Sequence, residues 1–303
     1  MSSLGKIREK LFHRLLSKKV QEQGENVIIG IAIVSFLLHL AIVFLVDYNW
    51  IQLSNPPKLL TNPIAAIYTP FSFILIYEVY LLIYYLPQST TSYIGKQYEI
   101  ITLIVIRRIF KDLANIDLTQ VWFEDKYDLQ FTYDIIATLL LFFLIFIFYR
   151  LNAQRIKSNI KGEELSQRIK RFINLKKSMS ILLVPALLIL ALYSLSTWLY
   201  ESYTSLTNMV TQMSNVNQVF FDDFFTILIL VDVLILLFSF FHTHQFSKVI
   251  RNSGFVISTI LMKLSFSTDG LLSTVLIVVA VAFGVIILWI HNLYPSLEKN
   301  KVR

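Results

Sequence analysis

Cysteine is absent from the 303 residues, so the chain can form no disulfide, iron–sulfur cluster, thiolate zinc site or thioether-linked haem. Glycine is also scarce, and none of its eight residues belongs to a phosphate-binding loop or a nucleophile elbow. No paired-histidine metalloprotease motif occurs, and His242-Thr243-His244 offers only two metal ligands. These absences predict a protein that is not an enzyme, with no catalytic residue, cofactor or metal.

Charge is scarce for a chain of this length. Asp, Glu, Lys and Arg make up 16% of the residues, against about 25% in a soluble domain. Hydrophobic residues make up 55%, and the mean hydropathy is +0.62. Runs of about 18 or more apolar residues recur, each long enough to cross a hydrocarbon core of roughly 30 Å. The chain is therefore predicted to be an all-α polytopic membrane protein.

Eight stretches are predicted to cross the bilayer. A polar segment with a Pro-Pro pair, 49–57, ends the first span, and Pro63 and Pro70 set apart an interfacial or half-inserted piece before the second. The third span is weak because two arginines and a lysine interrupt it. The predicted spans cover approximately residues 27–48, 68–86, 97–114, 131–149, 181–200, 220–241, 253–266 and 271–291.

Lysine and arginine resist translocation, so their distribution orients the spans. Residues 1–26 form a basic amphipathic segment and residues 151–177 a basic linker, whereas the alternate loops are richer in Asp and Glu. Both termini, the linker and the 294–303 tail are therefore predicted to be cytoplasmic. Anionic lipid headgroups account for the net charge of +7, and nucleic acid is not expected as a partner. The N-terminal segment is interpreted as a surface anchor, with a partner-binding helix as the alternative.

The two halves of the chain show the same order of features, which predicts a tandem repeat of 27–150 and 178–293. In each half, a span with a central acid is followed by a short turn, a span with a central cation and a purely apolar span. The sequence IYEVYLL around Glu78 corresponds to LVDVLIL around Asp232, and TLIVIR ending at Arg107 corresponds to STILMK ending at Lys263. Two parallel four-helix units are expected, because a repeat of even span number keeps its orientation.

The same four charged residues are predicted to lie deep in hydrocarbon, where each costs at least ~2.5 kcal/mol unless it finds a partner. By the helical rise, Glu78 and Arg107 both lie about 15 Å deep from the same side, and so do Asp232 and Lys263. Two mid-membrane ion pairs are expected, Glu78 with Arg107 and Asp232 with Lys263. Such pairs either hold neighbouring helices in register or line a path for ions or protons.

Two further residues are secondary candidates for such a path. Arg108 follows Arg107, but with Lys111 these residues give only a fragment of the spacing of a voltage-sensing helix. His39 lies in the middle of the first span. An imidazole there either relays protons or satisfies a hydrogen bond in the helix bundle.

Each half also resembles the phosphate-starvation-inducible PsiE family of small bacterial four-span membrane proteins. The resemblance rests on Tyr77-Glu78-Val79, on Ile106-Arg107-Arg108 with Asp112 following, and on the closing IILWIHN of residues 286–292. The chain departs from that family in being doubled, in carrying Lys263 where an arginine is expected, and in placing Asp269 one position late. The resemblance implies a bacterial inner-membrane location and a link to envelope or phosphate stress, without an established biochemical activity.

Two functions remain as hypotheses. The first is a small channel or transporter for ions or protons, with the four charged residues along its path and a homo-oligomer as a possible requirement. The second is a non-conducting membrane scaffold or stress-response regulator that binds partners at the cytoplasmic face through the N-terminal segment and the linker. A hydrated cavity reaching the charged residues would favour the first, and a tightly packed interior the second.

Overall fold

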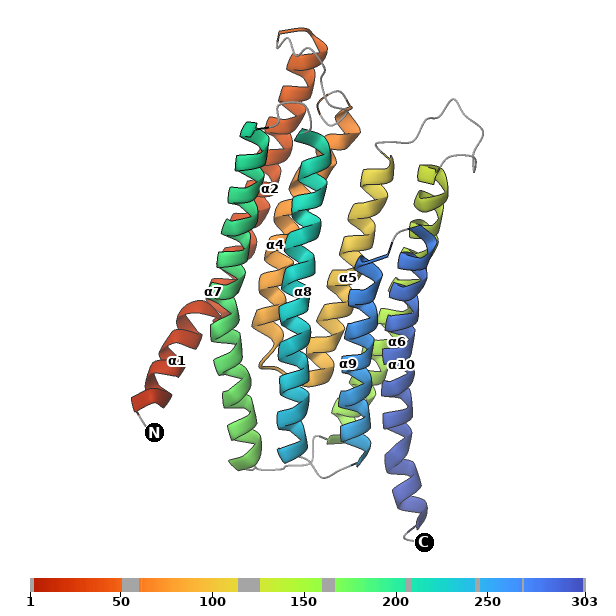
Figure 1. Cartoon of the computed structure of the whole chain (residues 1–303). Helices are drawn as coiled ribbons and strands as arrows, with labels where there is room; N and C mark the ends of the chain where they lie inside the picture. Colours follow the sequence, from red (N-terminus) through yellow and green to blue (C-terminus); the bar gives the residue numbers. More distant parts are fainter. Residues whose placement is uncertain are drawn as a thin grey trace. The chain divides into compact units, whose positions relative to one another are not determined.

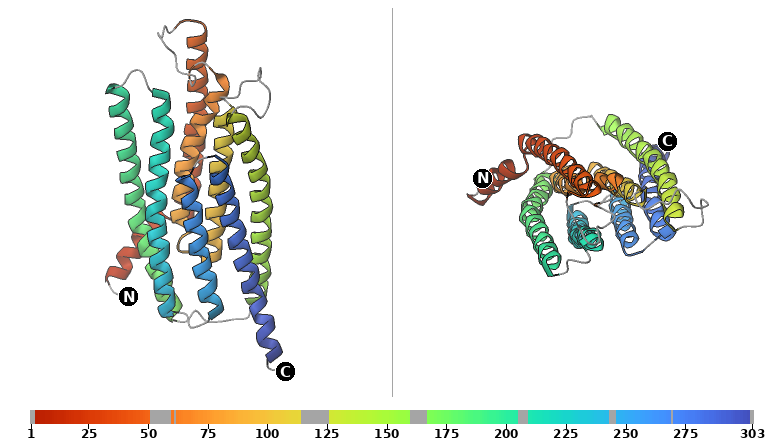
Figure 2. Two further views of the ribbon diagram at one scale, coloured as in Figure 1. Left: turned by 45° about the vertical axis from the view of Figure 1, so that its right-hand side comes forward. Right: turned by 90° about the horizontal axis from the view of Figure 1, so that it is seen from above.

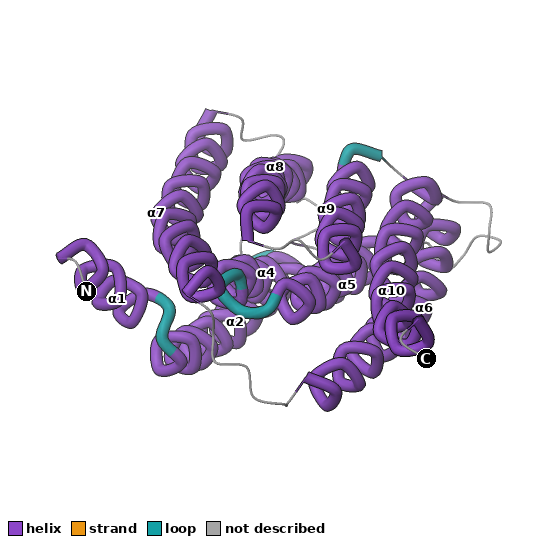
Figure 3. The backbone as a smooth tube through the Cα atoms, turned by 90° about the horizontal axis from the view of Figure 1, so that it is seen from below, coloured by secondary structure: helices purple, strands orange, loops and turns teal. Residues whose placement is uncertain are grey.

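All elements described in the computed structural model of the chain are helices (Figures 1 and 3). The described residues are 3–50, 60, 62–113, 126–159, 167–204, 209–242, 246–268 and 270–301. Their elements are α1 (Ser3–Leu15), α2 (Lys18–Asp47), the 3₁₀ helix η1 (Pro63–Ile67), α4 (Tyr68–Tyr85), α5 (Thr90–Leu113), α6 (Lys126–Asn159), α7 (Gln167–Thr204), α8 (Met209–His242), α9 (Phe246–Phe266) and α10 (Gly270–Lys301). The all-α prediction is confirmed for this part of the chain.

Six helical stretches within the described residues are long and apolar enough to cross a membrane. They are Gly5–Asp47, Asp128–Gln154, Lys170–Tyr193, Asp223–Phe241, Phe246–Phe266 and Gly270–Tyr294. The chain is thus a multi-pass helical membrane protein. The apolar part of α4, Thr69–Tyr85, is shorter, and α5 carries the cations that weaken the predicted third span. The count of eight spans therefore stays a prediction.

Large apolar side chains lie exposed along the middle of several of these helices. Leu38 of α2 exposes 60% of its surface, and Leu139 of α6 exposes 65%. Soluble monomers rarely present contiguous apolar patches larger than a few hundred Å². Hydrocarbon, by contrast, solvates such side chains without cost, so these helix faces are suited to contact with lipid.

Proline and glycine mark helix boundaries at two places. Pro63 opens η1 and Pro70 lies in the first turn of α4, so a separate 3₁₀ helix precedes the helix of the second predicted span, and its interfacial or half-inserted placement stays a prediction. Gly270 opens α10 with a φ of 66°, a left-handed conformation that glycine adopts without strain. The chain can therefore turn between α9 and α10 within a few residues.

Several helices begin well before the apolar runs that predicted them. α5 begins at Thr90 instead of near residue 97, and α9 begins at Phe246 instead of near residue 253. Polar residues extend a helix as readily as apolar ones, whereas hydropathy detects only the part suited to hydrocarbon. Predictions on residues 51–59, on the loop acids Asp117, Glu124 and Asp125, on His244 and on Asp269 lie outside the described residues.

Two compact units make up the chain. Unit 1 comprises Met1–Ile83, Leu103–Ile135 and Ile181–Phe224, and unit 2 comprises Tyr84–Thr102, Ile136–Ser180 and Phe225–Arg303. Each unit draws segments from both halves of the sequence. The tandem repeat of 27–150 and 178–293 stays a prediction.

In unit 1, two tyrosines of α4 fix the junction between α1 and α2. Ser17 caps α2 by accepting a backbone N–H of the first turn at 3.4 Å. The hydroxyl of Tyr80 donates to the carbonyl of Leu15 at 2.9 Å, and that of Tyr77 donates to the carbonyl of Gln21 at 2.9 Å. The predicted N-terminal segment is thus divided: α1 is a short separate helix, and the remainder continues into the first span.

In unit 2, α9 and α10 lie side by side (Figures 1 and 2). Gly254 permits a close approach, because a Cβ at this position would lie 2.8 Å from Cγ1 of Ile287. Ser258 of α9 donates to the carbonyl of Ala280 at 2.7 Å and also contacts the hydroxyl of Tyr98 at 2.9 Å. Small residues with hydroxyl bonds between helices are the usual means of helix association in membranes.

Gly284 of α10 leaves room for the buried ring of Tyr98. A Cβ at Gly284 would lie 2.7 Å from Cζ of Tyr98. We expect Gly284→Ala to displace this ring from Ser258 and to lower stability by about 1–3 kcal/mol. Thermal unfolding in detergent measures the change against Gly30→Ala, where a Cβ meets nothing within 4 Å. Equal unfolding temperatures for the two variants would contradict the close packing at Gly284.

Candidate functional site

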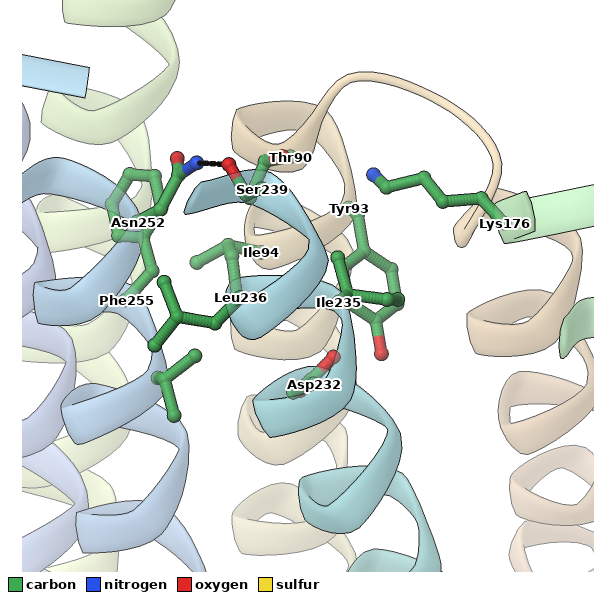
Figure 4. Close-up of a pocket in the computed structure, with 11 residues that line it drawn as sticks. Thr90, Tyr93, Ile94, Lys176, Asp232, Ile235, Leu236, Ser239, Asn252 and Phe255 are labelled. Atoms are coloured by element: carbon green, nitrogen blue, oxygen red, sulfur yellow. Dashed lines mark hydrogen bonds between the residues drawn. The ribbon is translucent and has the colours of Figure 1, made fainter. Parts of the chain in front are cut away.

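A small cavity lies in unit 2 among faces of α5, α8 and α9, with one lysine from α7 (Figure 4). Residues three and four apart share a helix face, and each of the three helices lines the cavity with such a set. The space open to the centres of water molecules is about 20 Å³. The lining residues are Thr90, Tyr93 and Ile94 of α5, Lys176 of α7, Asp232, Ile235, Leu236 and Ser239 of α8, and Asn252, Phe255 and Val256 of α9.

Asp232 is a buried carboxylate of this cavity, with 5% of its surface exposed. Its Oδ2 accepts a hydrogen bond from Nε2 of Gln97 at 3.0 Å. The Oε1 of Gln97 accepts in turn from the hydroxyl of Thr259 at 3.0 Å, which fixes the orientation of the amide. All three side chains are buried. Because Gln97 is neutral, the carboxylate is hydrogen-bonded without being neutralised.

Tyr93 brings a hydroxyl to the same place. Its ring extends from α5 toward Asp232, and its hydroxyl faces the carboxylate (Figure 4). This hydroxyl interacts electrostatically with Asp232 and lies near Gln97. This buried oxygen is close enough to Asp232 and Gln97 for weak hydrogen bonding, but it makes no hydrogen bond of regular geometry with a described residue. An unsatisfied buried hydroxyl is costly, which makes it a natural position for a bound molecule.

Lys176 supplies a cation at the cavity. Its Nζ donates to the carbonyl of Gln88 at 3.0 Å, in the turn that precedes α5. The ammonium also lies 5.4 Å from the ring centroid of Phe172, a cation–π distance. Lys176 exposes only 2% of its surface. Its charge acts on Asp232 through space without an ion pair between the two groups.

A polar network lies where α8 ends and α9 begins. Asn252 donates through Nδ2 to the hydroxyl of Ser239 at 3.0 Å, as Figure 4 shows. Oδ1 of Asn252 accepts from the guanidinium of Arg251 at 2.8 Å. Nδ1 of His291 lies 3.1 Å from the carbonyl of Ser247. These contacts hold the wall of the cavity between α8 and α9 in a defined geometry.

The size of the cavity limits what Asp232 can hold. About 20 Å³ is enough for one water molecule. No group of three or more His, Asp or Glu side chains that could hold a metal ion occurs in the described parts of the chain. A carboxylate in a space of this size can bind a proton, and the space admits one water molecule beside it.

The second predicted ion pair joins Asp232 to Lys263. In the structure, each of these two residues has a hydrogen bond to another side chain. Lys263 donates to the hydroxyl of Thr226. Asp232 accepts a hydrogen bond from Gln97, and its pairing with Lys263 stays a prediction. Glu78 of α4 and Arg107 of α5 belong to unit 1 and are both half-buried. Their pairing stays a prediction.

Both secondary candidates have contacts in unit 1. Arg108 forms a two-pronged ion pair with Asp134, Nε to Oδ2 at 2.5 Å and Nη2 to Oδ1 at 2.7 Å. Gln130 also donates to Oδ1 of Asp134 at 2.9 Å. Nδ1 of His39 lies 2.5 Å from the hydroxyl of Thr69. Arg108 thus joins α5 to α6, and His39 joins α2 to α4.

The sequence pattern did not reveal Tyr93, Gln97, Lys176 or Asp134 as site residues. Tyr93 lies before the predicted start of the third span, and Lys176 falls in the predicted linker. Gln97 is the first residue of the predicted third span, and Asp134 lies inside the predicted fourth span. Neither position carried a predicted role. A useful signal was available, since Thr90, Tyr93, Ile94 and Gln97 share one helical face once the start of α5 is known.

The chain was compared with protein-family models, with curated proteins and with solved structures, and none of the three comparisons gave a match.

Proposed function

We propose that this protein moves protons across the membrane and that Asp232 is the group that binds them. The observation that carries the proposal is the buried carboxylate at the end of a water-sized cavity, held by a neutral amide instead of a cation. A carboxylate inside a membrane span is costly, so its position favours a functional role. A carboxylate that only held helices together would be expected to face a cation, as Asp134 faces Arg108.

A proton fits this site better than a larger ion. A hydrated ion needs several water molecules around it, and the cavity admits about one. A bare metal cation needs several oxygen ligands in place of its hydration shell. A proton needs only an oxygen that can take it and a hydrogen-bonded neighbour that can pass it on. Glu78, Arg107 and Lys263 are further members of the proposed path.

The sequence supports a membrane location, an orientation and a repeat organisation for the proposed function. The excess of lysine and arginine in residues 1–26 and 151–177 supports cytoplasmic termini and contact with anionic lipids. The resemblance of each half to the PsiE family supports the inner membrane of a bacterium, two four-span repeats and a role in stress. A homo-oligomer is compatible with this role, because one chain need not form a complete path.

The scaffold hypothesis is supported by α1. Its apolar side chains Ile7 and Leu11 expose 53% and 42% of their surfaces, and basic residues surround them in the sequence. Such a helix suits a membrane surface or an acidic partner. A protein of this second kind would carry no flux, so the same measurement separates the two functions.

Flux through the purified protein tests the proposal. Proteoliposomes with a trapped pH-sensitive dye are energised by a potassium diffusion potential, and we expect proton uptake well above that of empty vesicles. The double variant Glu78→Gln with Asp232→Asn should lose this uptake, because both acids of the proposed path are neutralised. Uptake by the double variant equal to that of the wild type would eliminate the proposal, and replacing protons by sodium or chloride probes the selectivity.

A further inference from the structure

We infer that the cavity binds one water molecule, held by the hydroxyl of Tyr93 and the carboxylate of Asp232, and that Tyr93 positions this water to exchange a proton with Asp232. The inference rests on the proposed function and extends it. It assigns a binding site for a particular molecule and a role to a residue that the sequence did not reveal.

Tyr93 and Asp232 line the cavity with oxygens that can form further hydrogen bonds, and these oxygens support the water site. The Tyr93 hydroxyl is buried and faces Asp232, and its contacts with Asp232 and Gln97 fall short of regular hydrogen-bond geometry. Gln97 occupies Oδ2 of the carboxylate, which leaves Oδ1 for a water molecule or a proton. A buried water needs two to four polar partners and a free volume of at least about 10–15 Å³. Tyr93 and Asp232 supply two polar partners, and the cavity has a free volume of about 20 Å³.

The neighbouring cation does not compete for this position. The Lys176 ammonium is held by the Gln88 carbonyl and by the Phe172 ring. It thus sets the electrostatic potential of the cavity while the water position stays open. The apolar wall formed by Ile235 and Leu236 gives a water molecule no alternative partner. Ser239 and Asn252, which also line the cavity, are hydrogen-bonded to each other, so we place the water at Tyr93 and Asp232.

The proton transfer balances without any further reactant. A protonated Asp232 gives its proton to the water as its own O–H bond breaks. One O–H bond forms on the water, which becomes a hydronium ion that donates a hydrogen bond to the Tyr93 oxygen. The reverse sequence reloads Asp232 from the cavity.

Tyr93→Phe tests the role of the hydroxyl because it keeps the ring that lines the cavity. We expect proton uptake in the proteoliposome assay to fall about tenfold, the effect of losing one hydrogen bond that holds the water. Tyr98→Phe is the matched control, since it removes another buried hydroxyl one turn away on α5 that does not line the cavity. Uptake by Tyr93→Phe equal to that of Tyr98→Phe would overturn the positioning role of the Tyr93 hydroxyl.

Infrared difference spectroscopy tests the water independently of flux. Spectra of the protein in lipid are recorded at two pH values in H₂¹⁶O and H₂¹⁸O. The wild type should give a carboxyl band that Asp232→Asn lacks and an isotope-sensitive water band that Tyr93→Phe lacks. An unchanged water band in Tyr93→Phe would overturn the water site. If the wild type shows both bands but no proton uptake, the proposed function fails while the water site stands.

Discussion

Asp232→Asn alone is expected to reduce proton uptake by about 100-fold, the lower end of what a positioned proton-transfer group contributes. Asparagine has nearly the same shape and can still accept from Gln97, but it cannot take up a proton. The loss should therefore occur without unfolding. Proteoliposome uptake together with a monodisperse size-exclusion profile measures both properties.

Asp223→Asn is the matched control for this variant. Asp223 lies on the same helix and its side chain is exposed, so its neutralisation should leave proton uptake within a factor of two of the wild type. Glu78→Gln alone shows whether the acid of unit 1 belongs to the same path. Wild-type uptake by Asp232→Asn would show that the cavity plays no part in transport.

Asp134→Ala is expected to lower the stability of the protein by about 3 kcal/mol, the largest effect on folding that we predict. Asp134 is fully buried and binds both Arg108 and Gln130. Its removal leaves the guanidinium of Arg108 without the carboxylate that neutralises it. Removing one member of a buried pair costs far more than the pair itself contributes. Chemical unfolding in detergent micelles measures the difference.

Two further variants separate this cause from a general loss of packing. Replacing both residues, Arg108→Met with Asp134→Leu, should recover most of the stability because no charge is left buried. Glu22→Ala removes a member of the exposed Lys18–Glu22 pair and should change stability by less than about 1 kcal/mol. If the double variant were as unstable as Asp134→Ala, an unneutralised charge would not be the cause.

Hydropathy and proline placement predicted much of the helical framework. The predicted spans from the fourth to the eighth each fall inside one helix, and a separate 3₁₀ helix begins at Pro63, before the helix that carries the second span. Helix beginnings were predicted less well, as α5 shows, because polar turns continue a helix without any hydropathy signal. That error placed Tyr93 outside the predicted helix and hid its position one turn from Gln97.

The candidate site was predicted in part. Asp232 was identified because an acid between Val231 and Val233 in a long apolar run is costly wherever it lies. Its partner was not, since depth along the membrane normal was the only coordinate available. Lys263 shares that depth, but the hydrogen bond to Asp232 comes from Gln97.

The sequence by itself determined that this is a helical membrane protein and that Asp232 lies within a span. Both properties depend on composition and on the constant rise of a helix, which can be read along one dimension. Only the tertiary structure decided that Gln97, Tyr93 and Lys176 surround Asp232 and that Asp134 neutralises Arg108. These choices depend on the rotation of each helix about its axis and on which helices are neighbours, and packing alone sets both.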